Sequence, residues 1–173
     1  MADRIRHADE LINGLTNNAV RDPLTGLLNR TAFNDALGQE IARTRRYGGS
    51  FSLIILDFNN FTRVNRQVGR EAGDEIIQWM GRLLTEHTRA SDVPYRLGQD
   101  VFTILCPWTS GDYAEAVAGR LTVLVAEAKP PITVEGGLSL ATGTATCPGD
   151  AQEAPALFHA AERALARSKV AAG

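Results

Sequence analysis

Two aspartates stand where a metal ion or a hydroxyl group could be bound. Asp57 directly follows the apolar run Phe51–Leu56, which predicts a buried strand, and Asp100 stands just past Gly98-Gln99, which predicts a hairpin tip. If the two strands are neighbours, both carboxylates lie at one edge of a sheet. Mg²⁺ is commonly held by one or two carboxylates together with substrate phosphates. The alternative is that both side chains are solvated loop acids.

A second polar group surrounds the start of a predicted helix. Gly69 and Gly73 precede Asp74, and Asn65 lies in the short helix before them. Asp74 could accept two N–H bonds from a guanine edge, and Asn65 could add a donor and an acceptor. On position alone, an N-cap explains Asp74 better.

Alternating helices and strands must position these residues. Helical patterns cover residues 31–47, 61–68, 71–88, 113–128 and 153–169, and strand patterns cover 51–56, 95–97, 101–105 and one long or two short stretches within 132–147. Because a hairpin lies between helices, we expect an α+β fold in which helices flank a central, mostly antiparallel sheet.

The N-terminal segment forms a unit of its own. Apolar residues recur at alternating spacings of three and four, which predicts a helix over residues 1–20 that ends before Asp22-Pro23: Ile5, Ala8, Ile12, Leu15 and Ala19. We interpret it as a signalling helix that binds a second copy or a protein partner. An amphipathic helix lying on its own domain is the alternative. The chain is thus divided into residues 1–20 and a domain over 21–173.

Composition excludes several classes of protein. The formal net charge of −2 gives no field that favours a nucleic acid polymer or an anionic membrane, and no apolar run approaches the roughly 20 residues that span a bilayer. Two cysteines, Cys106 and Cys147, make neither a disulfide framework nor a zinc site, and both are expected to pack as core thiols. These features predict a cytoplasmic domain with no membrane segment in this chain.

Five motifs resemble, in order, those of the GGDEF domain of the diguanylate cyclase family. Residues 22–30 (DPLTGLLNR) are similar to D-x-L-T-G-L-x-N-R, and residues 56–65 (LDFNNFTRVN) to L-D-I-D-x-F-K-x-I-N. Residues 69–74 (GREAGD) resemble G-H-x-x-G-D, and residues 96–102 (RLGQDVF) stand where the family has R-Y-G-G-D-E-F. Residues 161–169 (AERALARSK) resemble A-D-x-A-L-Y-x-A-K. The resemblance runs from residue 21 to the end of the chain.

This resemblance implies a fold related to class III nucleotidyl cyclases and polymerase palms, in which two GTP-loaded domains form cyclic di-GMP with Mg²⁺. The implied roles are metal binding by Asp57 and the Phe58 carbonyl, and guanine binding by Asn65 and Asp74. Lys169 is implied to reach the phosphates, and Asp100 to bind metal and accept a proton. Mg²⁺ is expected only in company with GTP.

The same signature departs from the family at several positions. Val101 replaces a glutamate and therefore offers no oxygen to a metal or a proton. Gln99 replaces a glycine where the nucleotide approaches the backbone, and a positive φ there would strain it by on the order of 1 kcal/mol. Thr62 replaces a lysine, and Asn59 an aspartate. Since each lost transition-state stabiliser typically lowers a rate by about 10²–10³, Asp100 is expected to be a vestigial catalytic residue.

An intact ligand motif precedes this altered signature. Arg89-Ala90-Ser91-Asp92 places its aspartate six residues before Gly98, as in the inhibitory product-binding R-x-x-D site of the family. An arginine can donate two parallel hydrogen bonds to a phosphate or to guanine, while a carboxylate can accept hydrogen bonds from guanine N–H groups. Arg120 is placed as a third member by approximate family spacing. A surface ion pair at a helix end is the alternative.

Three functions follow. The first is a catalytically impaired GGDEF domain that acts as a cyclic-di-GMP receptor through Arg89, Asp92 and Arg120. The second is a weakly active diguanylate cyclase with Asp57 and Asp100 as metal ligands. The third is a GTP-binding or dimerisation module without turnover, for which Asn65, Asp74 and Lys169 would bind the nucleotide.

Overall fold

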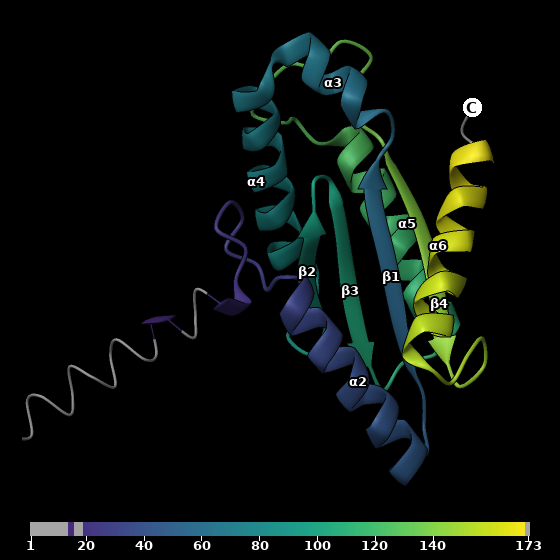
Figure 1. The fold of residues 1–173 in the computed structure, drawn as a ribbon. Helices are drawn as coiled ribbons and strands as arrows, with labels where there is room; N and C mark the ends of the chain where they lie inside the picture. The colour runs from purple at the N-terminus through teal and green to yellow at the C-terminus, as the bar shows by residue number, and fades with distance from the viewer. Residues whose placement is uncertain (1–13, 16–18, 172–173) are drawn as a thin grey trace, which may run out of the picture.

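A computed structural model describes residues 14–15 and 19–171. Five helices and four strands are defined in it (Figure 1). The helices are α2 (Arg30–Tyr47), α3 (Phe61–Val68), α4 (Arg70–His87), α5 (Gly111–Glu127) and α6 (Ala154–Ala171). The strands are β1 (Phe51–Phe58), β2 (Val93–Gly98), β3 (Val101–Pro107) and β4 (Leu140–Cys147).

The four strands form one sheet in the order β2-β3-β1-β4, and each neighbouring pair is antiparallel. β1 is central, and all eight of its residues are buried, as the continuous apolar run predicts. Because β1 and β3 are neighbours, the ends that carry Asp57 and Asp100 meet at the same end of the sheet. The expected α+β architecture is confirmed.

Helices cover both faces of the sheet. Helices α3, α4 and α5 pack over the face formed by Ile54, Leu56 and Phe102, and α2 and α6 pack over the opposite face of Leu53 and Ile55. Figure 1 shows α2 crossing the near face of the sheet, with α5 behind it. The core is therefore divided into two layers, one on each side of the sheet.

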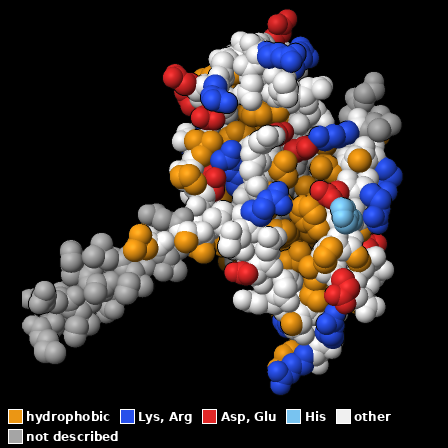
Figure 2. All heavy atoms as spheres, viewed as in Figure 1, with side chains coloured by type: hydrophobic (Ala, Val, Ile, Leu, Met, Phe, Trp, Pro, Cys, Tyr) orange, Lys and Arg blue, Asp and Glu red, His pale blue; other side chains and the backbone are white. Residues whose placement is uncertain are grey.

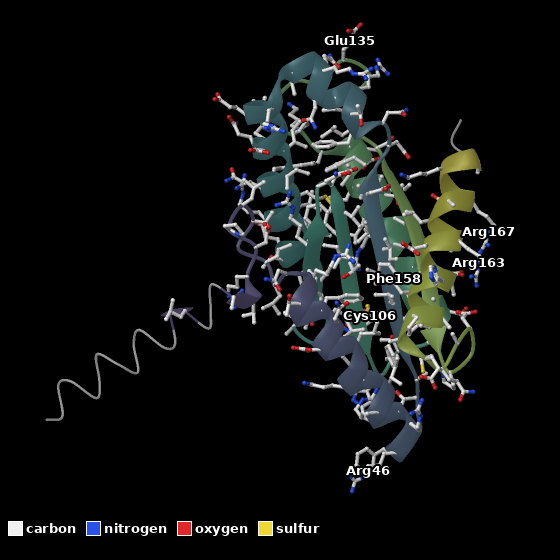
Figure 3. All side chains as sticks on the ribbon, in the orientation of Figure 1. Arg46, Cys106, Glu135, Phe158, Arg163 and Arg167 are labelled. Atoms are coloured by element: carbon white, nitrogen blue, oxygen red, sulfur yellow. The ribbon has the colours of Figure 1, made fainter. Side chains whose placement is uncertain are left out.

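Helices α2 and α6 leave a shallow apolar strip between them. Phe158 extends from α6 toward α2, where its ring lies 5.9 Å from that of Phe33 (Figure 3). Hydrophobic side chains between the two helices stay visible at the surface (Figure 2).

One glycine sets the height of α6 above the sheet. A Cβ at Gly143 of β4 would lie 2.2 Å from the Ala161 carbonyl oxygen and 2.3 Å from the Leu165 amide nitrogen. The helix backbone therefore rests directly on the backbone of the edge strand. This close approach fixes the position of α6, which carries Lys169.

Three expectations from the sequence were wrong in detail. Asp57 lies inside β1 and not after it, because pairing with Ala141 of β4 extends the strand to Phe58. Residues 132–139 form no strand, and Gly136 and Gly137 there adopt left-handed backbone with φ of 82° and 74°. Asp74 is not an N-cap, since α4 begins at Arg70 with Gly69 as its cap.

The predictions about the cysteines and the N-terminal helix have different outcomes. Both cysteines are buried and unpaired, and burial, reinforced by the Asp92 charge, raises the pKa of the Cys106 thiol to about 12. No helix among the described residues is long and apolar enough to cross a bilayer. The helix predicted over residues 1–20 lies mostly outside the described residues.

Candidate functional site

A cavity of about 580 Å³ opens between α3, α4 and the β2–β3 hairpin. Its lining combines arginines, carboxylates and an amide with apolar floor residues: Phe61, Thr62, Asn65, Arg66, Arg70, Asp74, Ile77, Arg96, Gln99 and Asp100. Three of these are candidates from the sequence: Asn65, Asp74 and Asp100. A pocket of this size with convergent polar groups is typical of a small-molecule site.

The position of the Asn65 amide in the cavity lining depends on a glycine. Asn65 comes from α3 and Asp74 from the second turn of α4, where it is exposed to the cavity. A Cβ at Gly73 would lie 1.9 Å from Asn65 Oδ1. Only glycine at position 73 therefore lets Asn65 take this position beside Asp74.

Asp57 is paired with a lysine from the C-terminal helix. Lys169 Nζ donates to Asp57 Oδ2 at 2.6 Å, while Asp57 is only 7% exposed. The other oxygen, Asp57 Oδ1, is buried and accepts no hydrogen bond from the described part of the chain. The expected metal ligand is therefore held by Lys169 on one side and has an unused acceptor on the other.

Asp100 lies beside the same strand end. Its Oδ2 accepts from the Phe58 amide at 3.1 Å, so the hairpin turn is tied to β1. Burial and the nearby Asp57 carboxylate raise the pKa of Asp100 above its ordinary value. Asp57 and Asp100 thus lie near one another at this end of β1, where Asp100 binds the Phe58 amide, and the expected role of the Phe58 carbonyl stays a prediction. Among the described residues, no three His, Cys, Asp or Glu side chains form a metal-binding group.

The tip of the β2–β3 hairpin has a strained backbone at Gln99 and is held by hydrogen bonds from Arg96. Gln99 has φ of 45°, a left-handed conformation that is unfavourable for a residue with a side chain. The Arg96 guanidinium donates to the Gln99 carbonyl from Nε at 3.1 Å and from Nη2 at 2.8 Å, and to Asp22 Oδ1 from Nη1 at 2.9 Å. Val101 follows as the first residue of β3, and it supplies no polar side-chain atom.

The R-x-x-D residues gather at the opposite end of α4. Arg89 Nε donates to Asp92 Oδ1 at 2.9 Å, and the Tyr113 hydroxyl donates to Asp92 Oδ2 at 2.5 Å. The Arg89 guanidinium also stacks 4.3 Å from the centre of the Tyr113 ring. Arg120 Nη2 donates to the His87 carbonyl at 3.0 Å, two residues before Arg89, so α5 brings the third predicted member to the same surface.

Sequence reasoning missed several of these contacts. Tyr113 was interpreted only as the start of a helix, and its contact with Asp92 depends on how α5 docks. Arg66 and Arg70 face the cavity, and their spacing of four on a predicted surface could have indicated a basic rim. Gly73 had a detectable signal, since glycine in the first turns of a helix is disfavoured unless something approaches closely.

Comparison with known proteins assigns the fold to a family. The model of the family described as "Diguanylate cyclase, GGDEF domain" matches residues 19–173. The chain belongs to the GGDEF domain family.

Relatives of this GGDEF domain include the diguanylate cyclase DgcP of Pseudomonas aeruginosa, which is 36% identical over 153 residues. That match covers 87% of this chain and 22% of DgcP, so the chain spans about a fifth of the length of this relative.

Solved structures agree. The coiled coil and GGDEF domain of DgcB from Caulobacter crescentus, in complex with cyclic di-GMP, superimposes with a TM-score of 0.88 at 22% identity, over 98% of this chain and 91% of that one. A microbial GGDEF domain described in an interaction with cyclic di-GMP has a TM-score of 0.75 at 29% identity, over 92% of this chain and 96% of that one.

Proposed function

We propose that this GGDEF domain is a receptor for cyclic di-GMP with little or no cyclase activity, and that Arg89, Asp92 and Arg120 form its ligand site. The observation that carries the proposal is the arrangement of these residues beyond the end of α4, where Arg89 is paired with the buried Asp92 and Arg120 binds the carbonyl of His87, two residues before Arg89. Two arginines around a carboxylate match a guanine dinucleotide, because the phosphates and the guanine Hoogsteen edge take guanidinium donors and the guanine N–H groups take the carboxylate.

The chemistry at the hairpin supports the second half of the proposal. Gln99 projects a side chain where a nucleotide must approach the backbone, and Val101 supplies no carboxylate. Lys169 already neutralises Asp57. Together these features weaken the charge stabilisation that phosphoryl transfer requires.

The residues at this end of β1 offer some of the oxygen ligands that Mg²⁺ requires. Asp57 Oδ1 is a buried oxygen without a hydrogen bond from the described residues, and the Asp100 carboxylate is close enough to feel the charge of Asp57. The Phe58 carbonyl, next in the chain to Asp57, is the expected third ligand. These groups would hold the ion next to the phosphates of a nucleotide, where its charge would neutralise them. Two carboxylates and a carbonyl are enough for binding with nucleotide, which keeps a weak cyclase as the second candidate.

A third candidate is GTP binding without turnover. Asn65 and Asp74 line one cavity, and Arg66 and Arg70 add positive charge to its lining. It predicts stabilisation by GTP and indifference to cyclic di-GMP. Dimerisation through residues 1–20 is a further expectation of this candidate.

The proposal is tested by isothermal titration calorimetry with cyclic di-GMP and GTP side by side. Wild type is compared with Arg89→Ala and, as a matched control, with Arg163→Ala, whose side chain points away from the sheet on α6 (Figure 3). We expect cyclic di-GMP to bind the wild type and the control, and binding to Arg89→Ala to weaken about tenfold or more. Lack of binding to wild type, or equal binding to all three, contradicts the proposal.

Activity is measured separately. The protein is incubated with GTP and Mg²⁺, and the products are separated by chromatography. Formation of cyclic di-GMP that disappears in Asp100→Asn would establish the weak cyclase instead.

A further inference from the structure

The carboxylate of Asp92 is fully enclosed. Its side chain is 0% exposed, and both oxygens are used: Oδ1 accepts from Arg89 Nε and Oδ2 from the Tyr113 hydroxyl at 2.5 Å. A guanine base that binds Asp92 must place N–H donors on these same oxygens. In this conformation neither oxygen is open to a ligand.

Tyr113 is the element of the enclosure that can move. Arg89 is anchored by a second bond, from Nη2 to the Pro107 carbonyl at 3.3 Å, whereas the only hydrogen bond of the Tyr113 hydroxyl among the described residues is to Asp92. Tyr113 is the third residue of α5, and its side chain is only half-buried. Its ring also packs against the core layer on this face of the sheet, so freeing Asp92 requires the displacement of a partly buried side chain.

The phenol is a persistent donor. Burial and the hydrogen bond to Asp92 raise the pKa of Tyr113 to about 12. The hydroxyl therefore keeps its proton at neutral pH and occupies the acceptor until another donor replaces it.

We infer that Tyr113 is a fourth residue of the ligand site, whose hydroxyl occupies Asp92 in the resting domain and must be displaced by the guanine edge. This inference rests on the proposed receptor function. On binding, one O–H donor is exchanged for guanine N–H donors. Arg89 stays beside the carboxylate, and the ring that it covered becomes available to a base. Tyr113 thereby sets the affinity of the site without contributing a charge.

The first test removes the hydroxyl alone. Tyr113→Phe keeps the ring but eliminates the bond that a ligand must break, so we expect cyclic di-GMP to bind about tenfold tighter than to wild type in calorimetry. The matched control is Tyr47→Phe, because Tyr47 is 68% exposed at the end of α2. Its affinity should equal that of wild type.

The second test needs no binding variant. The chain has three tyrosines, so wild type labelled with ¹³C at tyrosine Cζ gives three resonances, and Tyr113→Phe assigns one of them. We expect cyclic di-GMP to shift the Tyr113 resonance and to leave the other two in place. A Tyr113 resonance that does not move would show that the hydroxyl stays on Asp92.

The outcomes separate this inference from the proposed function. Tighter binding by Tyr113→Phe than by wild type supports it. Equal or weaker binding by Tyr113→Phe, or a Tyr113 resonance unmoved at saturation, overturns the role of Tyr113 and leaves the receptor function standing. Absence of binding to both proteins overturns the receptor function and this inference with it.

Discussion

Arg96 Nη1 lies 2.9 Å from Asp22 Oδ1, and this ion pair joins the segment that opens the domain to the hairpin that carries its signature. The same guanidinium holds the Gln99 carbonyl with two hydrogen bonds. Asp22 in turn accepts from the amide and the hydroxyl of Thr25. The strained tip is therefore maintained by contacts with residues more than seventy positions earlier in the chain.

We expect Arg96→Ala to lower the free energy of unfolding by about 2–3 kcal/mol, because it leaves a largely buried carboxylate and a turn carbonyl without their donor. Both side chains of the pair are about 15% exposed. The control is Arg45→Ala, whose partner Glu153 and own side chain are 71% and 62% exposed. That variant should change stability by less than about 1 kcal/mol. Equal losses in urea unfolding would contradict the assigned role of Arg96.

The acid stability of the domain should depend on Asp22. Burial raises the pKa of Asp22, but hydrogen bonds from Thr25 and Arg96 outweigh this and hold the pKa below its ordinary value of 3.8. Because the folded-state pKa is depressed, the carboxylate stabilises the fold above about pH 4, and this contribution is lost as the pH falls through the folded-state pKa. The stability difference between wild type and Asp22→Asn should thus be largest near neutral pH and shrink below about pH 4. Urea unfolding across this range measures it, and a difference independent of pH would disprove it.

Gly73→Ala and Gly119→Ala make a matched pair. Both glycines lie inside helices, and alanine should raise helix propensity at each by about 1 kcal/mol. At Gly119 the new methyl group meets open space, whereas at Gly73 it would collide with Asn65 Oδ1. We therefore expect Gly119→Ala to stabilise the domain, and Gly73→Ala to give no such gain. If GTP binds beside Asn65, Gly73→Ala should also weaken it about tenfold in calorimetry. Equal stabilisation by both substitutions would show that the Asn65 side chain can move away from the new methyl group at no cost in stability.

Lys169→Met should increase the affinity of the domain for a divalent cation. The ammonium group is a counter-ion that competes for Asp57, and removing it leaves a buried carboxylate that a metal can satisfy. We expect Mn²⁺ to bind on the order of fivefold tighter, and to raise the melting temperature more in the variant than in wild type. Electron paramagnetic resonance of free Mn²⁺ measures the affinity. Lys129→Met is the control, since Lys129 is exposed and is the other lysine of the chain; a gain there would point to net charge alone.

Restoring the signature should restore chemistry. Gln99→Gly relieves the strain of a left-handed residue, about 1 kcal/mol, and preserves the backbone carbonyl that Arg96 holds. Val101→Glu supplies the missing carboxylate. The double variant should convert GTP to cyclic di-GMP at least about 10²-fold faster than wild type, and Gln99→Gly alone should gain stability with little activity. Wild type that already matches the double variant would refute the impaired catalysis proposed here.

Much of the fold could be predicted from local patterns. The unbroken apolar run of β1 predicts a central buried strand, and Gly48, with φ of 75°, ends α2 where a glycine stop is expected. The length of β1 could not be predicted, because its last two residues are ordered by β4, a strand of small and polar residues with weak periodicity. Pairing between strands overrode the local signal there.

The candidate site was predictable residue by residue but not contact by contact. Asn65 and Asp74 lie where their motifs indicate, yet their geometry depends on the missing side chain at Gly73. Lys169 was expected to reach phosphates, and the structure pairs it with Asp57 from 112 positions away. Tyr113 and Asp92 belong to different elements, so only the docking of α5 brings them together. Such contacts depend on how helices and strands pack together, and this packing produces no recognisable residue pattern in a single sequence.

The close packing of α6 on Gly143 means that the Lys169–Asp57 ion pair can be lost by a substitution at a third position. Lys169 reaches Asp57 because the backbone of α6 contacts the backbone of the edge strand β4. Any larger residue at position 143 would push α6 away from the sheet. A single mutation in β4 would then release the acid from its lysine while both residues stay unchanged. Relatives in which this position is not glycine should have lost the pair through displacement of the helix, with no mark at either charged position.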